Sequence, residues 1–125
     1  MAVTHAMPVR NLIADTVTAQ IDISGLGKIL FQPTGGASNI ANLPFSATAF
    51  GAAASAVATA AAITDDTNCT AGTVAIFAVQ QNDNTAVFSG SVTATGGGGD
   101  IILSSVAIGQ GDTISISSLT YEAPQ

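Results

Sequence analysis

Apolar residues near the start of the chain recur at intervals of three and four. The apolar set that follows Pro8 at this spacing is Val9, Leu12, Ile13, Val17 and Ile21. Arg10, Asn11, Asp15 and Thr16 occupy the other face. This period predicts one amphipathic helix over residues 9–19, with Pro8 in its first turn. The residues before it, 1–8, are predicted to form a flexible or docking arm.

Beyond Gly25 and Gly27, short apolar or alternating runs separated by turn residues replace the helical period. These runs predict strands over residues 28–32, 40–45, 55–63, 73–80, 85–93, 101–103 and 113–122. Pro44 interrupts the second run, which is typical of an edge strand. The run 73–80 is apolar on both faces, so it predicts a central, buried strand.

Residues 52–63 are ambiguous because alanine favours helix, whereas Val57, Thr59 and Ile63 are β-branched. We favour a strand here, since the neighbouring segments also have strand patterns. Turn signals recur about every ten residues along the chain. The expected fold is therefore mainly β, a β-sandwich or jelly-roll of about 6–8 strands with one N-terminal amphipathic helix. We expect a single β domain over residues 9–125.

Charge is scarce in this chain of 125 residues, since only 8% of the residues are charged and the net charge is −6. Arg10 and Lys28 are the only lysine or arginine residues, so the clustered cations that bind nucleic-acid phosphates or anionic membranes are missing. A surface of Ser, Thr, Asn, Gln, Gly and Ala loses little hydration on contact with protein. The composition thus favours assembly with copies of itself or a partner, over a monomeric, threonine-rich β domain.

Reactive residues are few and far apart in sequence. The single histidine, His5, and the single cysteine, Cys69, cannot supply a nucleophilic triad or a set of metal ligands, and no intrachain disulfide is possible. The turn 65–68 lacks the ligand spacing of a calcium loop, and a strand rather than a helix is expected after the glycine run 96–99. We therefore expect no enzyme activity, no metal and no cofactor. We also expect no signal peptide and no membrane-spanning segment.

Several segments, taken together, have a familiar layout. They are residues 10–15, 27–31, 41–45, 49–53, 62–66, 71–77 and 114–121. In these segments the chain resembles a family of small virion proteins of tailed bacteriophages, which are encoded among head genes. Several proteins of similar build are capsid decoration, or cement, proteins. The resemblance implies a structural protein made in the bacterial host cytoplasm and located on the capsid surface of the virion. Its implied partners are the major capsid protein and itself, as a homodimer or homotrimer.

Two other functions remain open from the sequence. One is a tail or head–tail component of the same kind of virion, and the other is a carbohydrate-binding β-sandwich module. For the assembly function, we expect contacts with neighbours from the arm, from the loop after the strand 28–32, and from the glycine run. The candidate contact residues are Val3, His5, Met7, Gly35, Gly36, Asn39, Gly97 and Gly98.

Overall fold

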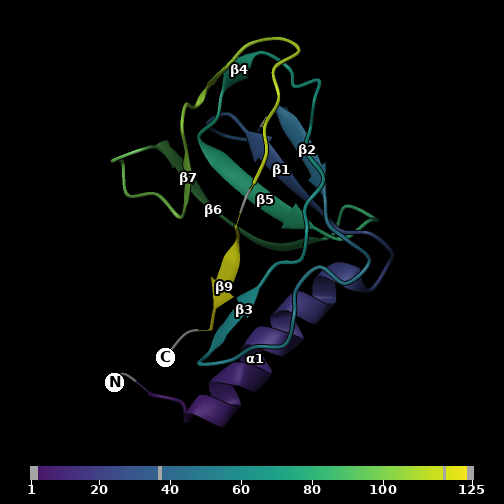
Figure 1. Ribbon diagram of the computed structural model, residues 1–125, viewed down its shortest axis with the longest axis vertical. Coiled ribbons are helices and arrows are strands. Elements are labelled where there is room, and N and C mark those ends of the chain that lie inside the picture. Colours follow the sequence, from purple (N-terminus) through teal and green to yellow (C-terminus); the bar gives the residue numbers. More distant parts are fainter. Residues whose placement is uncertain (1–2, 37, 117, 124–125) are drawn as a thin grey trace.

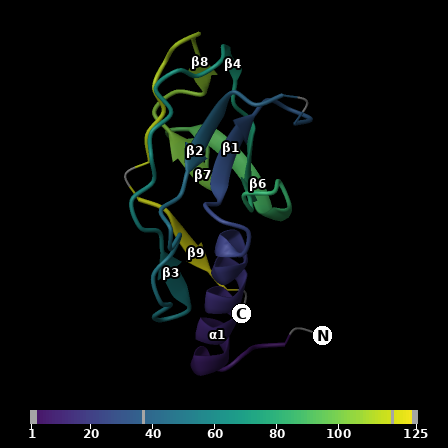
Figure 2. The same ribbon diagram turned by 90° about the vertical axis from the view of Figure 1, so that its right-hand side faces the viewer.

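The computed structural model describes residues 3–36, 38–116 and 118–123, and it is mainly β with one N-terminal helix, as the sequence predicts (Figure 1). A curled sheet occupies one end of the molecule, and the helix lies at the other end beside a two-stranded ribbon (Figures 1 and 2). The helical elements are α1 (Met7–Ala19) and the 3-10 turn η1 (Gln20–Asp22). The strands are β1 (Lys28–Gln32), β2 (Ala41–Pro44), β3 (Val57–Thr59), β4 (Gly72–Thr73), β5 (Ile76–Gln80), β6 (Ala86–Ala94), β7 (Ile101–Leu103), β8 (Ala107–Ile108) and β9 (Thr120–Glu122).

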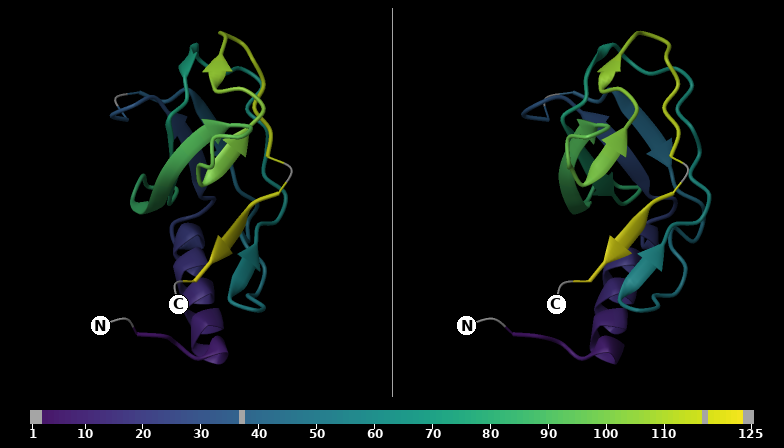
Figure 3. Two further views of the ribbon diagram at one scale, coloured as in Figure 1. Left: turned by 90° about the vertical axis from the view of Figure 1, so that its left-hand side faces the viewer. Right: turned by 60° about the vertical axis from the view of Figure 1, so that its left-hand side comes forward.

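The main sheet has the strand order β2-β1-β5-β6-β7, with β7 parallel to β6 and the other pairs antiparallel. Two ribbons, β3–β9 and β4–β8, complete the fold. The sheet curls so that one face encloses the core (Figure 3). Ile29 and Phe31 of β1, Leu43 of β2 and Val79 of β5 are fully buried there. The predicted edge strand and central strand correspond to β2 and β5.

Two predicted strands are much shorter in the structure because the chain changes hydrogen-bonding partners. In the run 73–80, the Val74 amide donates to the Val106 carbonyl, whereas the Ala75 amide donates to Gln32. The run therefore divides into β4 and β5. In the run 55–63, a tight turn at Ser55 and Ala56, both at positive φ, precedes β3, which covers only Val57–Thr59.

The predicted strand 113–122 is also too long. Within it, Ile114 makes an isolated bridge with Asp66, and β9 covers only Thr120–Glu122, while residue 117 lies outside the described residues. Each of these two pieces pairs with a different segment, since Ile114 faces Asp66 whereas β9 pairs with β3. A continuous alternating pattern does not reveal such a change of partner.

The helix begins two residues earlier than predicted, at Met7, and Pro8 occupies its first turn as expected. The predicted arm 1–8 therefore overlaps the helix. α1 does not lie across the main sheet. It packs against the β3–β9 ribbon and continues through η1 towards β1 (Figure 2). One long side of the helix remains uncovered as a result.

Candidate interaction surface

The side of α1 that faces the rest of the molecule combines polar side chains, which bond to backbone groups, with small buried residues. The Asn11 side-chain oxygen accepts a hydrogen bond from the Ala56 amide at 2.7 Å, and an Asp15 carboxylate oxygen accepts one from the Ala53 amide at 2.7 Å. The Asp22 carboxylate, just beyond α1, accepts the Ala49 amide with both oxygens at 3.2 Å. Side chains of the helical segment thus satisfy backbone donors of residues 49–56, which could not all pair within a sheet.

Small residues allow this close approach between helix and chain. Segment 49–56 is rich in alanine, and Ala14 of α1 is fully buried in a small cluster with Ala56 and Ala123. Thr18 is also buried, and its hydroxyl donates to the Ala14 carbonyl at 2.9 Å. Larger side chains at these positions would hold the backbone of 49–56 beyond hydrogen-bonding distance of Asn11 and Asp15.

Arg10 is turned towards the body of the protein as well. Its guanidinium donates to the Ala123 carbonyl at 2.9 Å and lies 3.4 Å from the Glu122 carboxylate, and its side chain is only 12% exposed. Arg10, Asp15 and Asp22 are the charged residues of α1 and η1. All three are therefore engaged with the body of the protein.

The opposite side of α1 is apolar and open to solvent. An amphipathic helix normally buries its apolar face. Here Val9 and Leu12 are 44% and 65% exposed, and Val17 is only partly buried. Ile13 lies at the edge of this side, since it is partly buried and packs against the cluster of Ala14, Ala56 and Ala123. Five residues, Val9, Leu12, Ile13, Thr16 and Val17, line one shallow depression, which we call the outer face of α1. Thr16 was predicted on the polar side of the helix, and the structure places it here instead.

Further exposed apolar side chains flank this face. Met7 and Val3 precede it, and Ile23 and Leu26 follow it. Of the seven large apolar side chains that are exposed among the described residues, six lie between residues 3 and 26. Exposed apolar side chains are thus concentrated in the N-terminal segment, and on the outer face of α1 they share one depression, as is typical of a protein-interaction site.

The residues predicted from the sequence as assembly contacts do not gather at one place. Val3 and His5 are exposed just before α1, and Met7 is exposed as its first residue. The loop after β1, which carries Gly35, Gly36 and Asn39, projects from the opposite end of the molecule (Figure 2). Gly97 and Gly98 lie in the connection between β6 and β7. Leu12, the most exposed apolar residue of the outer face, was not among the predicted contact residues.

The glycines and Asn39 have local structural roles. Gly35 and Gly36 turn the chain at φ values of +87° and +67°, and the side-chain oxygen of Asn39 accepts a hydrogen bond from the Gln32 amide group at 2.8 Å. Gly98 has φ +78°, and a Cβ atom on Gly97 would lie 2.6 Å from the Thr93 Cβ. These roles explain why the residues occur here, and their predicted contact with neighbours stays a prediction.

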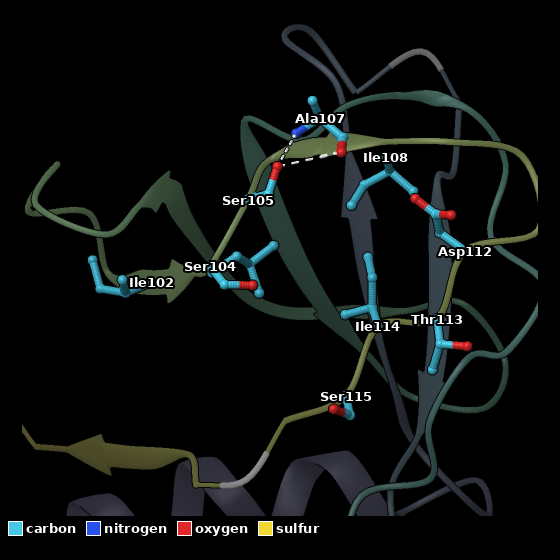
Figure 4. Close-up of a pocket in the computed structure, with 10 residues that line it drawn as sticks. Ile102, Ser104, Ser105, Ala107, Ile108, Asp112, Thr113, Ile114 and Ser115 are labelled. Carbon is cyan, nitrogen blue, oxygen red and sulfur yellow. Dashed lines mark hydrogen bonds between the residues drawn. The ribbon is translucent and has the colours of Figure 1, made fainter.

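A groove runs between β7 and the chain at residues 112–115 (Figure 4). Its volume is about 440 Å³, and serines and aliphatic side chains predominate in its lining. Its polar groups are bonded locally: the Asp112 carboxylate accepts the Gly109 amide at 2.7 Å, and the Ser105 hydroxyl accepts the Ala107 amide at 3.2 Å. The groove therefore brings together no acid–base pair and no nucleophile with a base.

Reactive groups are isolated elsewhere too. Among residues 3–36, 38–116 and 118–123, no three His, Cys, Asp or Glu side chains lie close enough together to hold a metal ion. Cys69 is buried, its thiol donates to the Asp66 carbonyl at 3.5 Å, and burial raises the pKa of the thiol.

Within residues 3–36, 38–116 and 118–123, no helix has the length and apolarity needed to cross a membrane.

No family model, curated protein or solved structure matches this chain. Among the features described above, the outer face of α1 is the one that indicates a function, namely contact with another protein.

Proposed function

We propose that this protein is a structural component of a bacteriophage virion, a decoration protein that binds the outer surface of the head and stabilises it. The observation that carries the proposal is the orientation of α1. The helix directs its charged residues to the protein's own backbone and leaves an uncharged, aliphatic face exposed. Such a face is suited to contact with protein. The resemblance of the sequence to small phage virion proteins is the reason for proposing a bacteriophage head as the particle to which the protein binds.

The proposed mechanism is mechanical. A decoration protein that contacts the major capsid protein and its own copies bridges adjacent capsid subunits and so adds contact area that resists the pressure of packaged DNA. Each contact can be modest, because attachment at several points multiplies the effective affinity. The net charge of −6 also prevents the protein from trapping DNA during assembly.

The alternative class, a carbohydrate-binding module, has less support. Such modules commonly present exposed aromatic rings to the sugar. The single tyrosine of this chain, Tyr121, is partly buried, and its ring packs on Phe88 with 5.2 Å between the ring centres. Phe88 in turn contacts the buried Phe77 edge-on at 6.3 Å. Tyr121 thus belongs to the packing between β9 and the main sheet.

Counting the copies of this protein per particle tests the proposal. Quantitative mass spectrometry of purified virions should find hundreds of copies for a decoration protein. A few to dozens of copies would assign the protein to the tail or the head–tail junction instead, and its absence would overturn the proposal. Particles that lack the protein should also rupture at lower temperature or under milder osmotic shock than complete particles. Equal resistance would contradict the cementing mechanism.

A further inference from the structure

We propose that β7 and the segment 113–116 accept an added β-strand between them, and that this strand is the N-terminal arm of a second copy of the chain. The arm is defined as residues 3–6, which precede α1. The inference does not depend on the proposed function, because it requires only this chain. It rests on three observations: the outer edge of β7, a second strand edge opposite it, and the conformation and composition of the arm.

β7 forms one edge of the main sheet. Among the described residues it pairs with β6 and with no strand on its other side. The outer edge of such a strand presents unpaired N–H and C=O groups, with which an extended segment of another chain can pair. Charged residues and proline commonly block this pairing, and β7, which consists of Ile101, Ile102 and Leu103, has neither. Ile102 is 47% exposed, so the edge is accessible.

A second strand edge lies opposite, in the segment 113–116. The Ile114 amide donates to the Asp66 carbonyl at 2.9 Å, and the Ile114 carbonyl accepts the Asp66 amide at 3.1 Å. Because the backbone groups of successive residues in an extended chain point in opposite directions, those of Thr113 and Ser115 point away from Asp66. Within the described part of the chain, neither Thr113 nor Ser115 has a hydrogen bond. Both residues are exposed and line the groove of Figure 4.

The two edges border one continuous groove. A second depression of about 310 Å³ adjoins the groove of Figure 4 and shares Ile102, Leu103 and Ser115 with it. This depression continues along β7 to Asp100 on one side and along the C-terminal segment to Thr120 on the other. In Figure 4 the chain leaves β7, turns, and returns on the far side of the groove in the opposite direction. An added strand would therefore be parallel to one edge and antiparallel to the other, and it would hydrogen-bond to both.

The lining of the groove determines which strand fits. Leu103, Ile108 and Ile116 are partly buried and pack against the main core, so they give the groove an aliphatic floor. Among the described residues that line the groove, the ionisable ones are Asp100 and Asp112, and none is a lysine or arginine. A strand with small or aliphatic side chains and no carboxylate is therefore suited to this groove, whereas an acidic strand would be repelled.

The arm meets these requirements. Its four residues, Val3, Thr4, His5 and Ala6, include no carboxylate and begin with two β-branched side chains, which favour strands. All four are exposed, and Ala6 has an extended backbone, with φ −61° and ψ 152°. The arm runs from the start of α1 away from the body of the molecule (Figure 3), so it is placed to reach a second copy. Pairing through an arm also keeps apart two bodies that each carry a net charge of −6.

Sedimentation equilibrium of the full chain tests the arm as the added strand. The wild type should self-associate as its concentration rises to about 100 µM, a range that detects weak pairing. Removal of residues 2–5 should leave a monomer, and it spares Ala6, whose carbonyl accepts the Arg10 amide at 3.0 Å. Thr4→Asp, which places a carboxylate in the arm, should also be monomeric. A monomeric wild type, or undiminished association after the removal of residues 2–5, would overturn the proposal.

The matched control is Val9→Asp, which places the same charge on the outer face of α1, at a residue that is 44% exposed. Because this face takes no part in the added strand, Val9→Asp should associate like the wild type. Association that is lost in Val9→Asp and kept in Thr4→Asp would overturn the arm as the occupant. So would an equal loss in both variants with their circular dichroism unchanged.

Hydrogen–deuterium exchange tests the groove as the place of pairing. In the wild type, the amides of residues 101–104 and 113–116 should exchange at least about twofold more slowly at about 100 µM than at about 1 µM, the effect of filling half of the grooves. The internal control is β1, which is paired on both sides and should exchange equally at both concentrations. Protection that depends on concentration but spares residues 101–104 and 113–116 would overturn the added strand.

The outcomes distinguish this inference from the proposed function. Association through the arm, in a protein that occurs in no particle, would support the added strand and remove the virion assignment. A chain that stays monomeric at about 100 µM and is nevertheless abundant in virions would overturn the added strand and leave the proposed function intact.

Discussion

Replacing Asn11 with alanine tests whether the polar side of α1 holds the protein together. The substitution removes the acceptor that lies 2.7 Å from the amide of Ala56, a fully buried residue. A buried donor left without a partner costs about 1–3 kcal/mol. Alanine recovers about 0.5 kcal/mol through its higher helix propensity. We therefore expect the free energy of unfolding to fall by about 0.5–2.5 kcal/mol.

The corresponding change in melting temperature follows from the size of the chain. A protein of 125 residues has an unfolding entropy of about 0.26 kcal/mol/K near its midpoint. Asn11→Ala should thus lower Tm by about 2–10 °C. Asn11→Asp keeps an acceptor at the same position and is the matched control, with a smaller expected change. Urea and thermal unfolding followed by circular dichroism measure both variants.

Leu12→Ala provides the decisive comparison. Leu12 is 65% exposed, so its truncation should change the stability of the monomer by less than about 0.5 kcal/mol. Unfolding is measured at two protein concentrations, because an effect of the substitution on association would depend on concentration, whereas an effect on the fold would not. A loss of about 2–5 kcal/mol for Leu12→Ala, independent of concentration, together with no effect of Asn11→Ala, would refute the orientation of α1.

Two further predictions concern the core. Gly27→Ala should destabilise the fold by more than about 2 kcal/mol in urea unfolding, because the new Cβ would lie 2.9 Å from the Ile21 carbonyl oxygen. The control is Gly51→Ala, which should be neutral because the new Cβ would have no atom nearer than 3.8 Å. Equal effects of the two substitutions would contradict the packing around Gly27. Cys69 should resist iodoacetamide until the protein unfolds. Burial raises the pKa of the Cys69 thiol above the ordinary 9.0, so the thiol ionises at lower pH in the unfolded chain than in the folded protein. The free energy of unfolding should therefore decline as pH rises above 9.0, and this decline should be absent in Cys69→Ala.

The local elements of this fold could be predicted because each rests on a short-range pattern. Pro8 and the three-to-four spacing identify α1, the apolar run 28–32 is β1, and Pro44 marks the edge strand β2. The extents of β3 and β9 could not be predicted, because they depend on where the chain exchanges one hydrogen-bonding partner for another.

The outward orientation of α1 could not be predicted for a similar reason. A helical period distinguishes an apolar face from a polar face, but it does not say which face meets the rest of the chain. Asn11, Asp15 and Asp22 face inward only because residues 49–56 present backbone amides to them. Their spacing of four and seven along one helical stripe, together with the alanine-rich segment, was the signal available in the sequence. Val3 and Met7, predicted as contact residues, are exposed, and their contact with neighbours stays a prediction. The outer face of α1 was not predicted as a surface.

Electron cryo-microscopy of the native virion tests the central claim most directly. The account predicts density for this fold on the outer surface of the head, in many copies, with the outer face of α1 covered by protein and the Asn11 side still packed against residues 49–56. A particle that lacks this density, or one in which the outer face of α1 is bare, would contradict the account.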